Sequence, residues 1–311
     1  MYAVLAGGVG AARFLRGLVR AVHPRDVAVV VNVGDDLELH GLHVCPDLDT
    51  ITYTLAGVVH EGQGWGRADE TFHVAEELAR FGVDSWFRTG DRDLATHLIR
   101  TQRLRAGIPL SRVASEISAA FGLEVRLLPA TDDLVSTRVR TTDGRVLHFQ
   151  EYWVREQANP PVAEVYLDGA DRARPAPGVL EALQDAEAVL VGPSNPVVSI
   201  GTILAVPGIR QALLDTPAPV VGVSPVVGGK VVRGMADRLL PTVGAEVSAA
   251  GVAHLYHEWL DGWVMDVADR SDAERVRSLG VETTVTDTLM KAPEVAEALA
   301  LTALTLAERL R

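Results

Sequence analysis

The stretch YAVLAGGVGAARFLRGLVRAVHPRDVAVVVNVGDD, residues 2–36, decides the fold class. It begins with the apolar run Tyr2–Ala6, continues through a glycine-rich turn into the amphipathic segment Ala11–Val22, and ends with a second apolar run, Val27–Val33. Strands that are apolar throughout, rather than alternating, are typical of parallel sheets covered on both faces. The order strand, helix, strand therefore predicts an α/β protein with a mainly parallel sheet.

The same alternation continues along the chain. Two further apolar runs, Ala188–Val191 and Pro219–Val223, predict buried strands. Longer amphipathic segments predict five more helices, at Glu70–Phe81, Asp93–Leu104, Ser111–Phe121, Val247–Leu260 and Pro293–Leu310. We expect these helices to cover both faces of the sheet.

The segment Thr137–Trp153 departs from this pattern. Two alternating runs flank Asp143-Gly144, a pair typical of the type I′ turn, which predicts an antiparallel hairpin. With the helices between residues 65 and 125, the hairpin predicts a smaller α+β subdomain of residues 65–177. This subdomain would be inserted into a core of residues 1–64 and 178–311, with the Pro- and Ala-rich segment Arg172–Gly178 as the linker.

Composition narrows the function classes. The 311 residues carry 41 acidic and 29 basic side chains, a net charge of -12, which argues against a nucleic-acid partner. The one cysteine, Cys45, excludes an intrachain disulfide and a cysteine-cluster zinc site. No apolar run reaches the roughly 18 residues needed to span a bilayer, and no signal peptide is recognisable. We therefore expect a cytoplasmic protein without a membrane anchor.

A group of carboxylates follows the second apolar run. It comprises Asp35, Asp36, Asp47 and Asp49. Mg²⁺ prefers oxygen ligands and usually binds through one or two carboxylates and substrate phosphates, so the group predicts a Mg²⁺ site. Aspartate and glycine are also ordinary turn-forming residues, so a solvated loop explains the same composition equally well.

Loops rich in glycine or polar residues follow three of the predicted strands as well. The residues that we expect to contact a nucleotide are Gly7, Gly8 and Gly10 after the first strand, Ser194, Asn195 and Pro196 after the third, and Gly228, Gly229 and Lys230 after the fourth. Ligands of open α/β sheets bind outside the carboxyl ends of the strands, so loops at one edge predict a common binding crevice.

Three familiar motifs are only approximated. Arg13 occupies the third glycine position of the dinucleotide fingerprint, which argues against nicotinamide binding. Ser224 and Val231 replace the first glycine and the final Ser or Thr of a Walker A loop. His254 and His257 lie three residues apart, and His257-Glu258 matches the start of a zincin motif, but Asp261 holds the position of its second histidine.

The segment Gly90–His97 predicts a helix start with Asp91 or Asp93 as the capping residue. Several basic residues gather around it, namely Arg88, Arg92, His97 and Arg100. These basic residues indicate a binding site for a second ligand, one that carries negative charge.

Taken together, several motifs in one order resemble the 2-phospho-L-lactate transferase family of deazaflavin coenzyme F-420 biosynthesis. The motifs are Gly7–Gly10, Asn32–Asp36, Pro46–Thr50 with Tyr53, Gly90–His97, Pro193–Gly201 and Ser224-Pro225. They span nearly the whole chain. Val9 and Cys45 look like the actinobacterial branch, for which the resemblance implies a phosphoenolpyruvyl rather than a phospholactyl donor.

The resemblance implies a modified Rossmann-like fold, often dimeric. It also implies transfer of the phosphoenolpyruvyl or phospholactyl group from a guanosine diphosphate adduct to the terminal ribityl hydroxyl of the deazaflavin Fo, releasing GMP with Mg²⁺. The carboxylates Asp35, Asp36, Asp47 and Asp49 would hold the metal, with Asp35 and Asp49 as catalytic residues. Asp49 and Arg88 would contact Fo, and the glycine-rich and Ser-Asn-Pro loops would hold the guanine nucleotide.

A related family of non-catalytic nucleotide-sugar-binding regulators is the alternative. Its members share the first glycine loop and the Asp-Asp strand end. They tend to continue with Asp-Asp-Gly-Gly-Ser-Ser and Pro-Pro-Gly-Asp, whereas this chain has Asp35–Glu38 and Pro46–Asp49. The departures favour the transferase.

Overall fold

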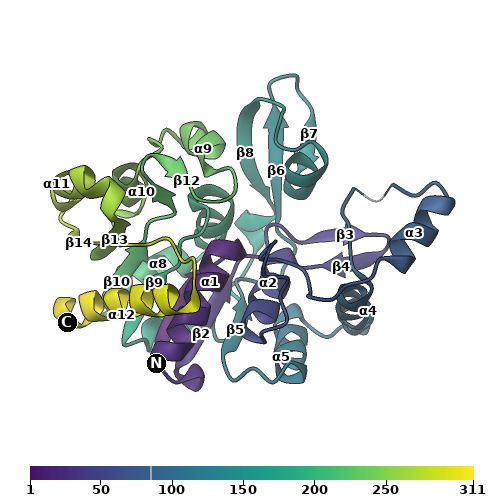
Figure 1. Ribbon diagram of the computed structural model, residues 1–311, viewed down its shortest axis with the longest axis horizontal. Coiled ribbons are helices and arrows are strands. Elements are labelled where there is room, and N and C mark those ends of the chain that lie inside the picture. Colours follow the sequence, from purple (N-terminus) through teal and green to yellow (C-terminus); the bar gives the residue numbers. More distant parts are fainter. Residues whose placement is uncertain (85) are drawn as a thin grey trace.

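The computed structural model describes residues 1–84 and 86–311, and its centre is a seven-stranded parallel sheet (Figure 1). The strand order is β14-β13-β10-β9-β1-β2-β5. The strands are β1 (Tyr2–Ala6), β2 (Val27–Val31), β5 (Arg126–Pro129), β9 (Ala188–Val191), β10 (Val220–Val223), β13 (Gly262–Asp266) and β14 (Glu282–Thr286). The α/β fold class is confirmed, with a mainly parallel sheet as its core.

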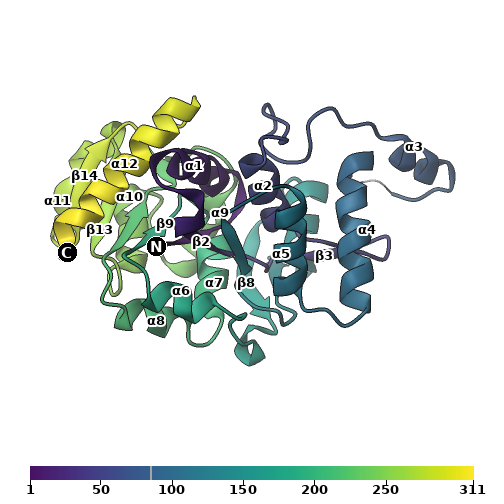
Figure 2. The same ribbon diagram turned by 90° about the horizontal axis from the view of Figure 1, so that it is seen from below.

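Helices cover both faces of this sheet, which lies between α1 and α12 on one side and α6 and α8 on the other (Figure 2). Alternate residues of β1 supply the two cores: Val4 packs with the first helix pair, and Leu5 with the second. The first face carries α1 (Gly8–Ala21), α2 (Pro46–Leu55), α5 (Leu110–Ala120) and α12 (Pro293–Leu310). The second carries α6 (Val179–Gln184), α7 (Gly201–Ala205), α8 (Ile209–Asp215), α10 (Ala249–Tyr256) and α11 (Ala273–Arg277).

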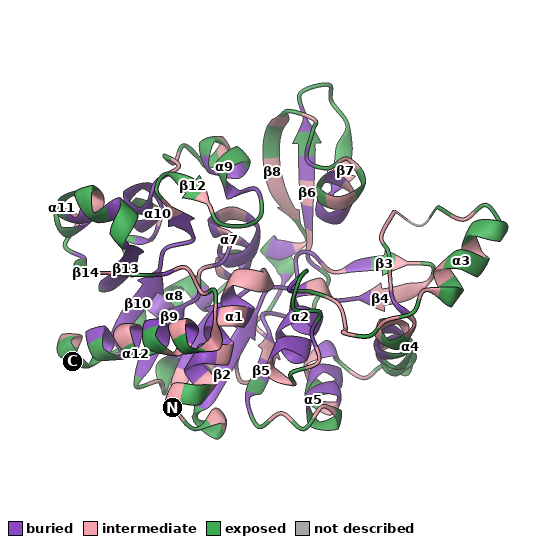
Figure 3. Ribbon diagram, in the orientation of Figure 1, coloured by how far each residue is buried: buried purple, intermediate pink, exposed green. Residues whose placement is uncertain are grey.

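Smaller elements project from the carboxyl edge of the sheet (Figure 1). A three-stranded antiparallel sheet has the order β7-β6-β8, with β6 at Ser136–Thr141, β7 at Val146–His148 and β8 at Val162–Asp168. A separate arm contains β3 (Leu37–Leu39), β4 (Leu42–Val44), α3 (His73–Arg80) and α4 (Asp91–Arg105). Figure 3 shows buried residues along the central strands, whereas α3 has none.

Most predicted elements are confirmed with shifted ends. β1, β9 and α12 have the predicted bounds, whereas β2 ends at Val31 and β10 begins at Val220. The hairpin at Asp143-Gly144 forms, but its second strand ends at His148. The predicted extension to Trp153 is wrong, because the backbone N–H of His148 donates to Glu151 Oε2 (2.9 Å) and the chain turns into a helical segment, Glu151–Arg155.

One strand corrects the predicted insert. β5 lies within residues 65–177 but pairs with β2 in the main sheet. Its sequence is four residues long and ends in Pro129, a residue that an edge strand tolerates. The division into a core of residues 1–64 and 178–311 and an insert of residues 65–177 otherwise stays a prediction.

None of the helices in residues 1–84 and 86–311 is long and apolar enough to cross a bilayer by itself. The segments Pro196–Ala205 and Ile209–Asp215 pass that test only as a pair, and they are bent by 85°.

Candidate active site

The crevice lies where the order of the parallel strands reverses. From β1 the chain moves to β2 and β5 on one side, and later from β9 to β10, β13 and β14 on the other. Such a switch point separates neighbouring loops and opens a binding site. A cavity of about 520 Å³ occurs here, and loops from both halves of the sheet line it.

The first glycine loop allows close packing at the floor of the cavity. A Cβ at Gly7 would lie 2.7 Å from Asp47 Oδ2, and a Cβ at Gly10 would overlap the carbonyl oxygen of Pro193. The backbone N–H of Gly7 donates to Ser194 Oγ (3.0 Å), which joins the loops after β1 and β9. Helix α1 starts at Gly8, so its N-terminus faces the cavity, a position that suits an anionic group.

Asp35 and Asp47 form a buried carboxylate pair in this cavity, being 5% and 7% exposed. Asn32 Nδ2 donates to Asp47 Oδ2 (2.9 Å), while Asp35 Oδ1 has no hydrogen-bond partner among the described residues. Burial raises the pKa of Asp47 to about 6. Burial and the charge of Asp47 raise the pKa of Asp35 well above its ordinary value. Two buried carboxylates with an unpartnered oxygen fit a divalent cation.

Asp49, by contrast, belongs to an ion pair. Arg100 Nη1 donates to Asp49 Oδ2 (3.0 Å) and Arg100 Nη2 to Asp49 Oδ1. Arg100 is 2% exposed, so the pair is buried. Burial raises the pKa of Asp49, although Arg100 opposes this effect.

Three further polar side chains, those of His97, Asp93 and Tyr53, lie around this ion pair. Arg100 Nη1 lies 3.2 Å from His97 Nδ1, which must accept, since a guanidinium has no lone pair to offer. The ring proton of neutral His97 is therefore on Nε2, which lies 3.6 Å from Asp93 Oδ2 and has no hydrogen-bond partner among the described residues. Tyr53 donates to Asp93 Oδ1 (2.6 Å). All five side chains belong to α2 and α4, and Asp49, Tyr53, Asp93 and His97 line the cavity.

The four predicted metal-binding aspartates do not form one cluster. Asp36 does not line the cavity: its Oδ2 lies 3.5 Å from His43 Nε2, on the side of Cys45. A turn separates the two side chains: Gly34 and Asp35 lie in a turn, and the backbone N–H of Asp36 donates to the carbonyl oxygen of Val33 (3.1 Å). The structure thus brings Asp35 and Asp47 together, and places Asp36 and Asp49 in separate surroundings.

The predicted nucleotide loops also differ from one another. Ser194 and Asn195 line the cavity, and Asn195 Oδ1 accepts from the backbone N–H of Val197 (2.9 Å) at the start of the helical segment Pro196–Ile200. Pro196 is buried behind them.

Gly228, Gly229 and Lys230 are exposed and lie outside the cavity lining. Gly228 donates its backbone N–H to Asp269 (2.9 and 3.0 Å), so this amide is not free for phosphate. The loop forms a small hairpin of β11 (Val226–Val227) and β12 (Lys230–Val231), which turns the glycines outward.

The basic residues around Gly90–His97 also separate. Arg88 lines the cavity, with its guanidinium 3.8 Å from the centre of the Phe72 ring, and His97 lines it too. Arg100 lies behind them in its ion pair, and the exposed Arg92 is outside the lining.

Sequence reasoning missed several cavity residues, four of which have side chains suited to binding a charged or planar ligand. They are Arg13, Trp65, Trp153 and Arg233. Trp65 and Trp153 are 45% and 38% exposed, a combination of apolar area and access that a planar ligand can use. One sequence feature could have identified Arg13 as a cavity residue, since it replaces a glycine of the dinucleotide fingerprint. The sequence around Arg233 has no such feature.

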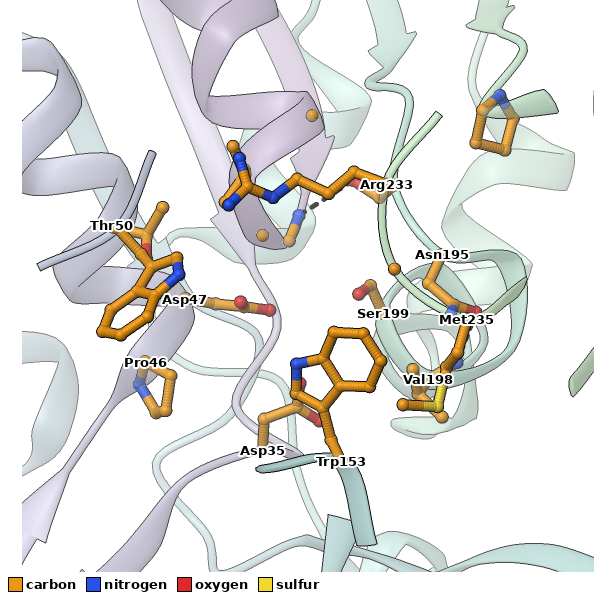
Figure 4. Close-up of a pocket in the computed structure, with 18 of the residues that line it drawn as sticks. Asp35, Pro46, Asp47, Thr50, Trp153, Asn195, Val198, Ser199, Arg233 and Met235 are labelled. Carbon is orange, nitrogen blue, oxygen red and sulfur yellow. Dashed lines mark hydrogen bonds between the residues drawn. The ribbon is translucent and has the colours of Figure 1, made fainter. Parts of the chain in front are cut away.

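Figure 4 shows the centre of the site. Asp35 and Asp47 face a space that Asn195 and Ser199 border from the other half of the sheet, with Arg233 above and Trp153 below in this view. Acidic groups that can hold a cation thus lie beside the start of α1 and opposite the loop after β9, two places that can hold phosphate. This arrangement suits transfer of a phosphate-linked group.

Comparisons with known proteins agree with this chemistry. The family model of 2-phospho-L-lactate transferase CofD matches residues 3–300. A phosphoenolpyruvate transferase of Streptomyces coelicolor is 54% identical over 313 residues, with 99% of this chain and 98% of the relative covered. One of Thermobifida fusca is 51% identical over 321 residues, with the same coverage. The solved structure of a UPF0052 family member from Bacillus halodurans, 18% identical, has a TM-score of 0.63 over 96% of this chain and 97% of that chain, and shares the fold.

Proposed function

This chain belongs to the 2-phospho-L-lactate transferase CofD family, and from that premise we propose which reaction it catalyses. It transfers a phosphoenolpyruvyl or 2-phospho-L-lactyl group from a guanosine diphosphate adduct to the terminal hydroxyl of the deazaflavin Fo. GMP is released, and the product enters coenzyme F-420 biosynthesis. The names of the relatives from Streptomyces and Thermobifida favour the phosphoenolpyruvyl donor.

The observation that carries the proposal is the carboxylate pair Asp35–Asp47 beside the glycine loop. Asp47 Oδ2 lies within reach of Gly7, and Gly7 is joined to Ser194 of the opposite loop. A phosphate held by these loops therefore lies next to the two acids. The guanine nucleotide would occupy the side of Asn195 and Ser199, and the acceptor the side of α2 and α4.

Asp35 and Asp47 would hold Mg²⁺, which fits the unpartnered Asp35 Oδ1 and the raised pKa of both acids. When bound, the ion would offset negative charge on the phosphates of the donor. Asp36 and Asp49 remain predicted ligands from the sequence, but their positions support this role less well.

In the reaction, the acceptor hydroxyl oxygen attacks the distal phosphorus of the donor as the bond from phosphorus to the GMP oxygen breaks. Positioning dominates such a step. Asp49 would accept the hydroxyl proton, because Arg100 occupies about one lone pair on each carboxylate oxygen and leaves others free. Arg88 and the unpartnered Nε2–H of His97 would contact the acceptor.

A homodimer in the cytoplasm completes the proposal. Both features stay predictions from the family resemblance, and the molar mass in solution, measured by light scattering, tests the first.

Incubation of the purified protein with Fo, Mg²⁺ and each guanylylated donor tests the reaction. We expect GMP and an Fo-phosphodiester product, identified by its mass. Thermal shift with GDP, a UDP-sugar and NADH separates the alternatives, because stabilisation depends on ligand concentration over its dissociation constant. Stabilisation by the UDP-sugar alone, without transfer, would favour the regulator and contradict the transferase.

A further inference from the structure

Two arginines meet at one wall of the cavity. Arg13 extends from the second turn of α1, and Arg233 from the segment after β12. A Cβ at Gly64 would lie 3.1 Å from Arg233 Nη1 and 3.7 Å from Arg13 Nη2, so both guanidinium groups reach the same point. Glycine at position 64 leaves the space for both.

Neither guanidinium has a carboxylate partner among the described residues. Arg233 Nη2 donates to the carbonyl oxygen of Gln63, and the guanidinium of Arg13 has no hydrogen-bond partner among residues 1–84 and 86–311. Arg16, one turn further along α1, is different, since it pairs with Glu61 at 2.6 Å. Burial and the charge of Arg13 lower the pKa of Arg233, the direction expected where two like charges repel each other at a cost in free energy. An anion between them would remove this cost.

The position of Arg233 favours an occupant other than the leaving nucleotide. In an in-line displacement the attacking and leaving oxygens lie on one axis through phosphorus, and its other three oxygens lie across that axis. In Figure 4 the axis from the acceptor side (Pro46, Thr50) to the nucleotide side (Asn195, Ser199) runs across the view, and Arg233 lies to one side of it. A substituent carried on the distal phosphate projects in such a direction.

We propose that Arg13 and Arg233 bind the carboxylate of the three-carbon acid that the distal phosphate carries. This inference rests on the proposed function and names the part of the donor that the pair recognises. A carboxylate accepts two parallel hydrogen bonds from a guanidinium, which fixes its orientation as well as its charge. The pair therefore selects donors that carry an acid over GDP itself.

The test compares three probes by calorimetry with Mg²⁺ present. They are GDP, the guanosine diphosphate ester of lactate or of enolpyruvate, and the same ester with its carboxyl group methylated. We expect Arg13→Gln and Arg233→Gln to weaken binding of the acid-bearing donor by about 10- to 100-fold and to change binding of GDP by less than about 3-fold. Methylation should weaken binding to the wild type similarly and have little further effect on Arg233→Gln.

The control is Arg16→Gln, which removes the same charge from the same helix outside the cavity lining. It should bind all three probes like the wild type. Equal losses for GDP and donor in Arg233→Gln would overturn the proposal in favour of a nucleotide phosphate contact, and unchanged donor binding in both variants would overturn it outright.

The same data separate this inference from the proposed function. A wild type that transfers the group while Arg13→Gln and Arg233→Gln behave like Arg16→Gln would remove only the carboxylate contact. A wild type that binds neither guanylylated compound and forms no product would remove the proposed function, and the contact with it.

Discussion

Arg100 and Asp49 form a bidentate ion pair, although they are 51 positions apart in the sequence and both side chains are buried. The pair fixes α4 to the first turn of α2, and so fixes the wall of the cavity that the acceptor would contact. Asp49 is therefore a structural residue as well as a candidate catalytic one.

Arg100→Met should destabilise the protein strongly. Removing the guanidinium leaves the Asp49 carboxylate buried and unpaired, which typically costs about 3–5 kcal/mol of unfolding free energy. Urea unfolding followed by circular dichroism measures it. The control is Arg103→Met on the same helix, whose pair with Glu116 is half-exposed and should contribute at most about 1 kcal/mol. Equal effects of both substitutions would contradict the buried pair.

Asp49→Asn should lower turnover by about 10²- to 10⁴-fold if this carboxylate accepts the hydroxyl proton. The variant also leaves Arg100 without its charge partner, so a stability loss can imitate a catalytic one. The double variant Asp49→Asn, Arg100→Met removes both charges and controls for this effect. Turnover that recovers in the double variant would exclude Asp49 as the base.

The metal-free protein should lose stability as the pH rises from 4 to 6 because of Asp47. Folding raises the pKa of this carboxyl from its ordinary value of 3.8 to about 6, so the folded state binds more protons in this range than the unfolded state does. The free energy of unfolding then falls as pH rises. Asp47→Asn keeps an oxygen for Asn32 and removes the titration. Without metal at pH 7.5 we expect it to be more stable than the wild type by roughly 1–3 kcal/mol.

Addition of Mg²⁺ at pH 7.5 should reverse that order. The ion offsets the repulsion between Asp35 and Asp47, so it should raise the melting temperature of the wild type more than that of Asp47→Asn. The exposed Asp171→Asn serves as the control and should respond like the wild type. Identical Mg²⁺ responses in wild type and Asp47→Asn would argue against the site.

Gly10→Ala should destabilise the protein even though Gly10 lies in a helix. Helix propensity alone favours alanine by about 1 kcal/mol. The added Cβ, however, overlaps the carbonyl oxygen of Pro193, a backbone atom that the loop after β9 holds in place. We expect a net loss of roughly 1–3 kcal/mol, as for other overpacked sites, by thermal unfolding. Gly62→Ala, where the nearest atom is 3.3 Å away on the side chain of His60, is the control.

The sequence predicts the strands that are short, apolar and continuous, and it misses those that are not. β1 and β9 have only apolar residues, and their predicted bounds match the observed ones. β14, Glu282–Thr286, contains three threonines and one valine, and its place at the sheet edge makes burial on both faces unnecessary. β13 begins with a glycine, and its burial depends on strands that are distant in sequence.

The helix α2 escapes prediction for another reason. Pro46 at the first position and acidic residues in the first turn are ordinary helix-start signals, but the same acids also suggest a metal-binding loop. Asp47 is helical and lines the cavity, and its binding of a metal stays a prediction.

The sequence predicts which residues line the cavity where those residues follow a strand end directly, as for Asp35 and the first glycine loop. The prediction fails where the role of a residue depends on a hydrogen bond or ion pair with a residue that is distant in the sequence. The sequence around Asp49 does not indicate that Arg100 donates to it. The sequence around Gly228 likewise does not indicate that its backbone N–H donates to Asp269. Such partners are a property of the tertiary structure.

Because the strand order reverses between β1 and β9, the two sides of the cavity are built by different segments of the chain. Segments that follow β2 build the side of α2 and α4, whereas segments that follow β9 and β10 build the side of Asn195 and Ser199. A chimera in which residues 37–125 are replaced by those of a relative should therefore have the acceptor preference of that relative. Its nucleotide preference should stay that of the present chain. The binding site for one reactant can then change in evolution while the binding site for the other stays the same.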